Sequence, residues 1–326
     1  MNWLITGGCG FIGRNLIKML INRNPEDSIR VIDNFSVGTP DDLDYATDNY
    51  REETIKQADW SAKEIQVIQG DILDENLAIE VSSGADVIVH LAANTGVGPS
   101  VENPRMDCVT NVIGTFNYLE AARRNKIKRF VFASSGAPIG ECNPPIHEEL
   151  ACHPVSPYGA SKMAGEGYCS SYARTFGVGT VALRFGNVYG PGSTHKSSVV
   201  AKFIRQALNG ETLEIYGDGS QTRDFIFTED LILAILAGAT TEGVGGEVFQ
   251  IATNRETTVL EVTDLLVKCL REKGVDSFDV IHGEKRLGDV MRNFSDTSKA
   301  KELLKWEPGV ELKEGLLSTV EWFMKK

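Results

Sequence analysis

The sequence places two side chains that could move a proton, Tyr158 and Lys162, four residues apart. They lie in the run SPYGASK (residues 156–162), where a serine followed by proline is a typical helix start, so we expect both on one helix face. The ordinary pKa of tyrosine is about 10, too high for a base at neutral pH, and a neighbouring ammonium lowers that pKa by stabilising the phenolate. The spacing therefore predicts a Tyr158 base activated by Lys162, which can also bond the ribose of a nicotinamide cofactor.

A glycine-rich turn near the N-terminus could hold the phosphates of such a cofactor. Residues 7–13 read GGCGFIG, between a short apolar run and an amphipathic segment. Glycines at this spacing let the backbone turn sharply and approach a pyrophosphate, which then lies at the N-terminus of a helix. The residues expected to contact the cofactor here are Gly7, Gly10, Phe11, Ile12 and Gly13.

The acid that ends the second apolar run, Asp33, indicates which dinucleotide binds. It lies about 20 residues beyond the last glycine, where a carboxylate accepts hydrogen bonds from both hydroxyls of the adenosine ribose. The same carboxylate would repel a 2′-phosphate, and the next residue is Asn34 rather than an arginine. Asp33 and Asn34 therefore favour NAD over NADP.

The elements that must position these residues alternate along the chain. Six nearly continuous apolar runs (WLIT, IRVID, IQVIQG, DVIVHLA, RFVFAS and TVALRF) are separated by longer amphipathic segments. Strands buried on both faces by helices have this pattern, which predicts an α/β fold with a doubly wound parallel (Rossmann) sheet. We expect an NAD-binding domain over residues 1–185 and a smaller α/β part, mainly binding substrate and interleaved with the first, over 186–326. The charged residues 40–63 should form an exposed helical insertion.

The composition limits which classes of binding partner and which cellular compartment we expect. The net charge is −12 without a basic stripe, which argues against nucleic acid or an anionic membrane as the main partner. No apolar stretch approaches the roughly 18–20 residues of a membrane helix. The six cysteines form no CxxC pair and the five histidines show no metal-ligand spacing, so we expect no disulfide framework, no metal and a reducing cytoplasm. His90 should close a buried strand.

Together these motifs resemble a known family. GGCGFIG, Asp33, Asn111 in TNVIGT, the Ser134-Ser135 pair and YGASK occur in the order typical of extended short-chain dehydrogenase/reductases. The later runs RFGNVYGPG, GDGSQTRDFIF and RLGDVMRNFSDTSKA are similar to the NAD-dependent epimerase/dehydratase branch, closest to UDP-glucose 4-epimerase-like enzymes. The resemblance implies tightly bound NAD, a nucleotide-diphosphate sugar as substrate with uridine as the favoured base, and a homodimer formed by the helices around residues 104–125 and 156–176.

The resemblance also implies roles for further residues. Ser135 would bridge the substrate and Tyr158, which completes a catalytic set of Ser135, Tyr158 and Lys162, while Asn111 would hold backbone geometry. Around the cofactor, Asp71 and Ile72 would contact adenine, and Leu91, Ala92 and Ala93 would line the site. The residues expected to bind substrate are Ser135, Asn187, Val200, Tyr216, Arg223, Arg286 and Asn293. Among these the arginines, with Arg292 as a third candidate, would hold the diphosphate, Val200 and Tyr216 would enclose the uracil, and Asn293 would lie near sugar C2.

Three activities of this branch share one first step, in which Tyr158 removes a proton from the sugar 4-hydroxyl while hydride passes to NAD. The dehydratases carry an Asp-Glu pair after the active-site hydroxyl, and the decarboxylases carry a Glu near that position. Here residues 135–140 read SGAPIG, with no carboxylate before Glu141. We therefore expect a 4-epimerase acting through a 4-keto intermediate.

Other readings stay open at this point. A UDP-glucuronate decarboxylase or a nucleotide-sugar 4,6-dehydratase is the alternative, followed by an epimerase acting at another carbon and, last, a non-catalytic NAD-sensing protein. Gly136, Pro138 and Ile139 depart from the usual pattern, in which a tyrosine typically stands at position 139. We expect them to reshape the wall beside the sugar, so the sequence leaves the identity of the sugar open.

Overall fold

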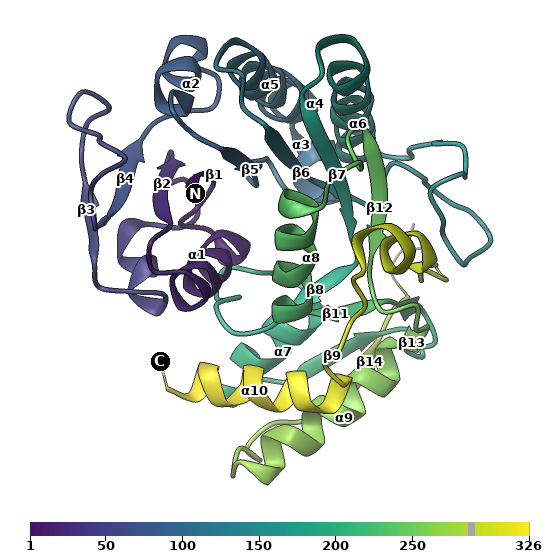
Figure 1. The fold of residues 1–326 in the computed structure, drawn as a ribbon. Helices are drawn as coiled ribbons and strands as arrows, with labels where there is room; N and C mark the ends of the chain where they lie inside the picture. Colours follow the sequence, from purple (N-terminus) through teal and green to yellow (C-terminus); the bar gives the residue numbers. More distant parts are fainter. Residues whose placement is uncertain (286–290, 326) are drawn as a thin grey trace.

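The core of the fold is one parallel sheet of eight strands (Figure 1). The structure, a computed structural model, describes residues 1–285 and 291–325. The strands are β1 (Asn2–Thr6), β2 (Ser28–Asp33), β3 (Tyr50–Glu52), β4 (Ile65–Gln69), β5 (Val87–His90), β6 (Arg129–Ser135), β7 (Gly179–Phe185) and β12 (Glu247–Ile251). Their order is β12-β7-β6-β5-β1-β2-β4-β3, and the six strands expected from the apolar runs are all present, which confirms the doubly wound fold.

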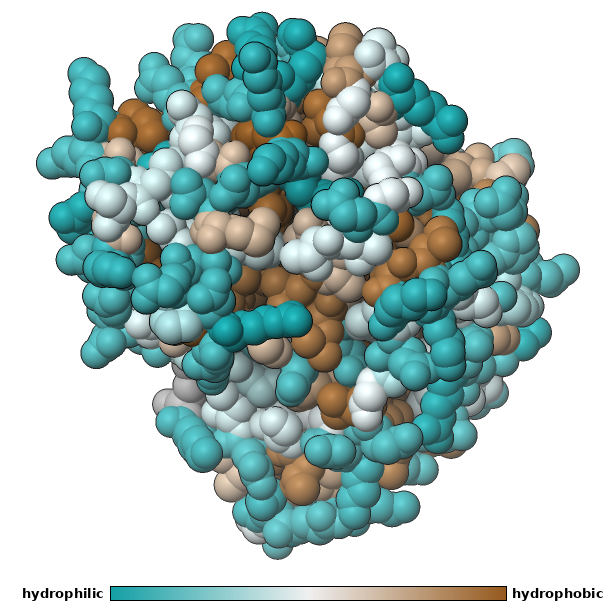
Figure 2. Space-filling model, in the orientation of Figure 1, coloured by the Kyte–Doolittle hydropathy of each residue, from teal (hydrophilic) through white to brown (hydrophobic). Residues whose placement is uncertain are grey.

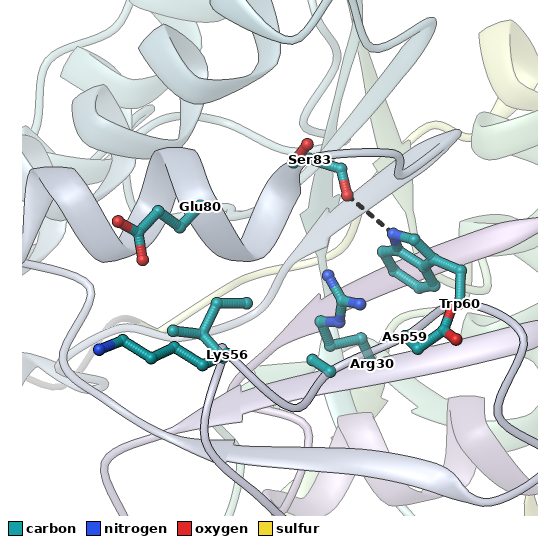
Figure 3. A pocket seen from close by; sticks show the side chains of 8 residues that line it. Arg30, Lys56, Asp59, Trp60, Glu80 and Ser83 are labelled. Carbon is teal, nitrogen blue, oxygen red and sulfur yellow. Dashed lines mark hydrogen bonds between the residues drawn. The ribbon is translucent and has the colours of Figure 1, made fainter.

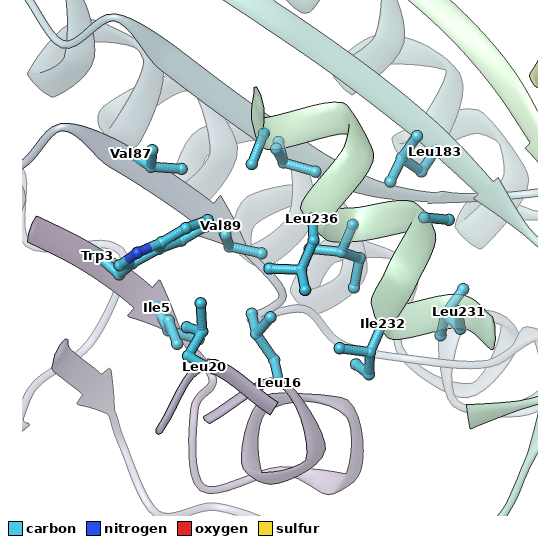
Figure 4. Close-up of a cluster of buried hydrophobic side chains, with 14 of the residues drawn as sticks. Trp3, Ile5, Leu16, Leu20, Val87, Val89, Leu183, Leu231, Ile232 and Leu236 are labelled. Atoms are coloured by element: carbon cyan, nitrogen blue, oxygen red, sulfur yellow. The ribbon is translucent and has the colours of Figure 1, made fainter. Parts of the chain in front are cut away.

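Helices cover both faces of this sheet because its strands are apolar on both sides. Trp3 and Ile5 of β1 belong to a cluster with α1 (Phe11–Arg23) and α8 (Thr228–Thr240), as Figure 4 shows. Leu4, between them, belongs to a second cluster with α2 (Glu75–Ser82), α5 (Gly114–Arg124) and α6 (Pro157–Phe176). Successive side chains of a strand point to opposite faces, so one strand serves both clusters.

The charged segment 40–63 differs from its expected form. It contains a short 3-10 helix, η1 (Pro40–Tyr45), and then β3, which pairs in parallel with β4 at the edge of the sheet. A capping box between Thr39 and Asp42, with proline at the first position, begins η1. The prediction of a purely helical insertion was therefore wrong: pairing with an open sheet edge makes part of this polar segment a strand.

The second half of the chain builds a smaller layer and also returns to the sheet. A third cluster joins α7 (Val199–Leu208), α9 (Val259–Glu272) and α10 (Leu312–Met324). Three two-stranded sheets lie beside these helices: β8 (Asn187–Tyr189) with β11 (Phe225–Phe227), β9 (Leu213–Tyr216) with β14 (Val280–Gly283), and β10 (Thr222–Arg223) with β13 (Thr257–Thr258). In contrast, α8 packs on β6 and β7, and β12 is the edge strand next to β7.

The connection between β5 and α5 is helical but irregular. It consists of α3 (Val97–Glu102), α4 (Pro104–Cys108) and a π-helical turn, η2 (Val109–Ile113), and a second π-helical turn, η3 (Ala300–Leu304), precedes α10. Among the described residues, no helix combines the length and apolar character needed to span a membrane. On the face in Figure 2, hydrophilic side chains form the periphery and hydrophobic surface gathers toward the centre, near α8.

Candidate active site

Tyr158 and Lys162 lie in the first two turns of α6, as the sequence predicts. The Ser156 side chain accepts a hydrogen bond from the Gly159 amide at 3.1 Å, and proline occupies the first turn, so the expected helix start is confirmed. Lys162 is 4% exposed, and its ammonium donates to the carbonyl oxygen of Ala133 in β6 at 2.8 Å. This contact anchors α6 to the carboxyl end of the central strand.

Ser135, the last residue of β6, meets the tyrosine. Its hydroxyl forms a side-chain hydrogen bond with Tyr158, and it also accepts from the Ala137 amide at 3.2 Å. The structure therefore brings Ser135, Tyr158 and Lys162 together where β6 ends and α6 begins.

The expected lowering of the tyrosine pKa is not found in this state. Burial raises the pKa of Tyr158 to about 12, with Asp107 acting in the same direction and the Ser135 hydrogen bond opposing it. Burial also lowers the pKa of Lys162 to about 8. The Lys162 ammonium lies 5.8 Å from the centre of the Tyr158 ring and donates to the Ala133 carbonyl. The four-residue spacing correctly predicted that Tyr158 and Lys162 lie close together, but burial determined the direction of the Tyr158 pKa.

The glycine turn forms a cradle at the N-terminus of α1. Gly7 has a φ of +68°, and a Cβ on it would lie 2.9 Å from the backbone of Ala92 in the loop after β5. A Cβ on Gly13 would lie 2.5 Å from Gly8, so α1 could not approach the turn as closely. Gly10 caps α1, and Phe11 and Ile12 begin it, half-buried. The backbone can therefore come as close to a pyrophosphate as the motif predicts.

Asp33 lies at the carboxyl end of β2, next to this cradle. Its two carboxylate oxygens accept from the amides of Cys9 and Phe35, both at 3.0 Å, and burial raises its pKa against these hydrogen bonds. A carboxylate has about four acceptor positions, so the backbone amides leave acceptor capacity for the ribose hydroxyls. Asn34 is exposed, with its side chain turned back to the Ser36 amide.

The loop after β5 is held against the cradle by a buried hydroxyl. The Thr6 side chain accepts from the amides of Leu91 and Ala92 at 3.2 and 3.1 Å and contacts Nδ1 of His90 at 2.9 Å. Thr115 contacts the other ring nitrogen at 3.2 Å, and burial lowers the pKa of His90 to about 3, so this histidine is neutral and closes a buried strand as expected. The sequence did not point to Thr6, although its place at the end of β1 could have.

The two residues expected to contact adenine differ in the exposure of their side chains. Asp71 is exposed, and its side chain accepts from the Leu73 amide at 2.9 Å. Ile72 is buried in the second cluster, where it packs on Gly114 of α5, and its carbonyl accepts from the Asn117 side chain. Its side chain therefore packs in the core, and a contact with the adenine would involve its backbone. Ala93, in the loop after β5, is half-buried.

Asn111 lies in the π-helical turn and joins two parts of the site. Its side chain accepts from the Asn94 amide at 2.7 Å and donates to the Asn94 carbonyl at 2.9 Å. The same amide group lies 3.0 Å from the Ser161 hydroxyl in α6 and 3.0 Å from Asp107 in α4. The expected backbone-holding role agrees with these contacts, whereas Asp107 was missed, although it precedes Asn111 by one helical turn.

The residues expected to bind the nucleotide lie on the elements of the second half of the chain. Asn187 in β8 and Tyr216 at the end of β9 are exposed. Val200 is 1% exposed, on the inner face of the amphipathic helix α7, and packs in the third cluster. Its side chain faces the core, so a contact of Val200 with the uracil would involve its backbone.

The arginines expected at the diphosphate contact different groups of the protein. Arg223 in β10 is half-buried and donates to the Thr222 carbonyl at 2.7 Å. Arg292 forms a bidentate pair with Glu256, at 2.7 Å for both contacts, so its guanidinium is already matched by a carboxylate. Asn293, next to it, donates its amide to the Thr222 hydroxyl at 3.3 Å. Arg286 lies outside the described residues.

The run SGAPIG turns away from β6 without a carboxylate. Ile139 is buried, at 1% exposure. A Cβ on Gly136 would meet nothing within 4 Å, which leaves open space beside Ser135. Glu141, the first carboxylate after this run, is exposed.

A pocket elsewhere on the surface is separate from these residues. It lies between the 53–63 segment and α2, where the Arg30 guanidinium stacks 3.8 Å from the Trp60 ring centre and Trp60 donates to the Ser83 carbonyl (Figure 3). None of the expected site residues lines it. The described residues contain no group of three or more His, Cys, Asp or Glu side chains that could hold a metal ion.

Comparisons with known proteins agree with this geometry. The model of the NAD dependent epimerase/dehydratase family matches residues 3–252. A UDP-glucose 4-epimerase of Mycolicibacterium smegmatis is 34% identical over 331 residues, covering 100% of this chain and 99% of that protein. The crystal structure of UDP-glucose 4-epimerase with UDP-glucose from Thermotoga maritima has a TM-score of 0.86 and 35% identity, and covers 100% of this chain and 99% of its own.

A further solved structure contains a UDP-sugar together with NAD. The UDP-glucuronic acid 4-epimerase of Bacillus cereus, in complex with UDP-glucuronic acid and NAD, has a TM-score of 0.85 at 29% identity, covering 100% of this chain and 99% of its own. The glycine cradle, the spare acceptors of Asp33 and the Ser135–Tyr158–Lys162 group of this chain fit the same cofactor. The chain is an enzyme of the NAD-dependent epimerase/dehydratase family, with NAD as its cofactor.

Proposed function

We propose that this enzyme is a UDP-sugar 4-epimerase that keeps NAD tightly bound and acts through a 4-keto sugar. The observation that carries the proposal is the meeting of Ser135, Tyr158 and Lys162 at the end of β6, next to a run without a carboxylate. Inversion at C4 needs one group to take and return the hydroxyl proton and room for the sugar to turn. Elimination or decarboxylation chemistry needs further acids or bases, and the SGAPIG run offers none.

The chain's own residues divide the work. As the phenolate, Tyr158 would take the proton of the 4-hydroxyl, and as the resulting phenol it would return that proton after the sugar has turned, with the Ser135 hydroxyl bridging the two oxygens. Lys162 keeps α6 against β6 and would contact the cofactor ribose. When bound, NAD would supply hydride-accepting and hydride-donating chemistry at C4. Gly7, Gly10 and Gly13 would hold its pyrophosphate, with Phe11 and Ile12 at the start of α1.

The rest of the cofactor and the nucleotide sugar would contact different sets of residues. Asp33 and Asn34 would bind the adenosine ribose, Asp71 and Ile72 the adenine, and Leu91, Ala92 and Ala93 the remaining wall. Residues 186–326 would supply most of the substrate contacts, with residues 1–185 as the NAD-binding domain. The residues that would hold the nucleotide sugar, with Ser135, are Asn187, Val200, Tyr216, Arg223, Arg286 and Asn293.

A homodimer in the cytoplasm completes the proposal. Large apolar side chains lie exposed on α6 and the adjoining π-helical turn, among them Ile113, Met163 (42% exposed) and Phe176 (52%). Side chains of this kind on neighbouring helices match what a paired helix interface buries. A dimer by analytical ultracentrifugation that becomes monomeric in Met163→Glu would support this assembly, and a monomeric native protein would exclude it.

The reaction is tested by incubating the purified protein with UDP-glucose, UDP-N-acetylglucosamine and UDP-glucuronate. Mass spectrometry and proton NMR of the products separate the rival activities. An unchanged mass with inverted stereochemistry at C4 is the expected result. Loss of carbon dioxide would identify a decarboxylase, loss of water a dehydratase, and inversion at another carbon a different epimerase, each in place of the proposal.

A further inference from the structure

A short segment from the second half of the chain is fastened across the start of α1. It consists of residues 190–196, between β8 and α7, and is called the strap below. Arg14 of α1 donates through Nη2 to the carbonyl of Gly192, and Asn15 donates to the carbonyl of Pro191 at 3.0 Å. A Cβ on Gly192 would lie 3.0 Å from the Asn15 side chain, so the strap backbone lies directly against the first turns of α1.

The far end of the strap is also held in place. Arg205 of α7 donates to the carbonyls of Thr194 and Lys196, both at 2.7 Å. Between these two residues, Nε2 of His195 lies 3.5 Å from the Asp42 carboxylate in η1. Contacts from α1, α7 and η1 therefore fix the position of the strap, and with it the place from which the Lys196 side chain starts.

The Lys196 side chain extends to the glycine cradle. It is half-buried, and its ammonium lies 5.8 Å from the ring centre of Phe11, which directly follows Gly10 and begins α1. Within residues 1–285 and 291–325, no carboxylate lies within 4.0 Å of this ammonium and its Nζ donates no hydrogen bond. Partial burial of a charge without an anion is costly, so this cation is suited to receive one.

The other charges at the start of α1 are already matched or have the wrong sign for a phosphate. Arg14 is paired with Asp42 at 2.5 Å, so a carboxylate compensates its guanidinium. Asp33, whose carboxylate accepts from the Cys9 amide in the cradle, is an acid. Each phosphate of a pyrophosphate carries a negative charge, and the helix N-terminus offers only partial positive charge. A full positive charge is available from Lys196.

We propose that Lys196 is a cofactor-binding residue, whose ammonium is carried by the strap to the start of α1 and binds the pyrophosphate of NAD in the glycine cradle. Lysine binds phosphate as a compact charge on a flexible stem, so the ammonium needs only a change of side-chain rotamer to leave the Phe11 ring for a phosphate oxygen. The strap then closes the cofactor site with a residue of the second half of the chain. Bound NAD leaves only after this contact is broken.

The diphosphate of a UDP-sugar has the same chemistry as the pyrophosphate of NAD. The contact with Phe11 favours NAD, because Phe11 follows the glycine turn at the N-terminus of α1, where a dinucleotide pyrophosphate binds. The experiment therefore measures both ligands separately.

The decisive variant is Lys196→Met, which removes the charge and keeps a long unbranched side chain. Lys196→Gln is a second neutral variant, and Lys196→Arg keeps the charge. Lys268→Met, at an exposed position of α9, is the matched control for the loss of one positive charge. Each purified holoenzyme is incubated with an excess of isotopically labelled NAD, and the exchange of bound cofactor is followed by mass spectrometry. Binding of UDP to the NAD-bound protein is measured by isothermal titration calorimetry.

We expect bound NAD to exchange at least about tenfold faster in Lys196→Met and Lys196→Gln, because a charged hydrogen bond is lost. Exchange should stay close to native in Lys196→Arg and Lys268→Met. A Lys196→Met protein that loses its NAD during purification, when Lys268→Met retains it, would be the extreme form of the same result.

Three outcomes would overturn the inference. The first is native exchange in both neutral variants. The second is equal acceleration in Lys196→Arg, which would show that side-chain shape matters and charge does not. The third is a weakened affinity for UDP at native NAD exchange, which would place the ammonium at the diphosphate of the substrate.

The inference rests on the proposed placement of the pyrophosphate in the glycine cradle, and the two can fail separately. NAD exchange needs no turnover, so a protein that epimerises no UDP-sugar but shows the expected exchange would overturn the proposed reaction and leave the role of Lys196 in place. Native exchange in Lys196→Met, together with weakened NAD binding in Gly7→Ala, would overturn the role of Lys196 and leave the cradle in place.

Discussion

The two sides of the active site are built in different ways. On the cofactor side, functional groups lie at strand ends and helix starts and are held by several contacts each: Asp33 accepts two backbone amides, and Asn111 joins a loop to α6. On the proposed nucleotide side, the residues lie on two-stranded sheets and near them, and Tyr216 and Arg292 are exposed, with the Arg292 side chain 57% accessible.

This difference matches the different demands of proton transfer and of substrate binding. A proton-transfer group must be held closely in place, because small misplacements of reacting groups are costly, and the end of a buried sheet provides that rigidity. Phosphate and base contacts tolerate more adjustment and can be made by exposed side chains that order on binding. We therefore expect changes on the cofactor side to affect rate or cofactor retention, and changes on the nucleotide side to affect substrate affinity.

The largest effect is expected from Tyr158→Phe, which removes the proton-transfer oxygen and leaves the ring packed. We expect kcat to fall by roughly 10²–10⁴-fold, the usual contribution of general acid–base catalysis. NAD content of the purified protein, measured after denaturation, should be unchanged. A variant with near-native kcat would show that the proton passes through another group. It would also remove the main reason for assigning the reaction chemistry to the cofactor side of the active site.

Gly7→Ala tests whether the cradle holds the cofactor. The new Cβ would lie 2.9 Å from the Ala92 backbone, and the φ of +68° alone costs an ordinary residue about 1–2 kcal/mol. We expect NAD to bind at least about tenfold more weakly by isothermal titration calorimetry. Gly167→Ala in α6, whose Cβ would meet nothing within 4 Å, is the control and should bind NAD normally. Equal affinities would place the pyrophosphate elsewhere.

Arg223→Ala tests the proposed phosphate contact on the other side. A charged hydrogen bond contributes about 1.5–3 kcal/mol, so we expect KM for the UDP-sugar to rise by roughly 10–100-fold. The change in kcat should be much smaller, because uniform binding of substrate and transition state is lost. Steady-state kinetics distinguish the two parameters, and a fall in kcat at unchanged KM would contradict the division of labour.

Arg292→Ala should have the smallest effect. Its guanidinium is already paired with Glu256 and mostly exposed, and exposed pairs of this kind contribute about 0–1 kcal/mol. We expect KM to change by less than about fivefold, and the same measurement on Arg223→Ala provides the contrast. A rise in KM as large as that of Arg223→Ala would show that Arg292 leaves Glu256 to bind phosphate.

Local sequence patterns were enough to predict much of this molecule. The six apolar runs became strands, Ser156 and Pro157 began α6, and the glycine turn closed around the start of α1. These features depend on interactions among residues near one another in the chain, such as capping, steric freedom and the burial of a continuous apolar run. The sequence by itself therefore determined the fold class, the cofactor cradle and the spacing of the catalytic pair.

Only the tertiary structure decided what those groups become. It placed segment 50–52 as an edge strand, buried the side chains of Ile72 and Val200 in the core, and paired Arg292 with Glu256. It also set the direction of the Tyr158 pKa and joined the buried Asp107 to Asn111. The physical reason is that burial and charge compensation depend on which distant segments meet, and neither is visible in the local order of residues.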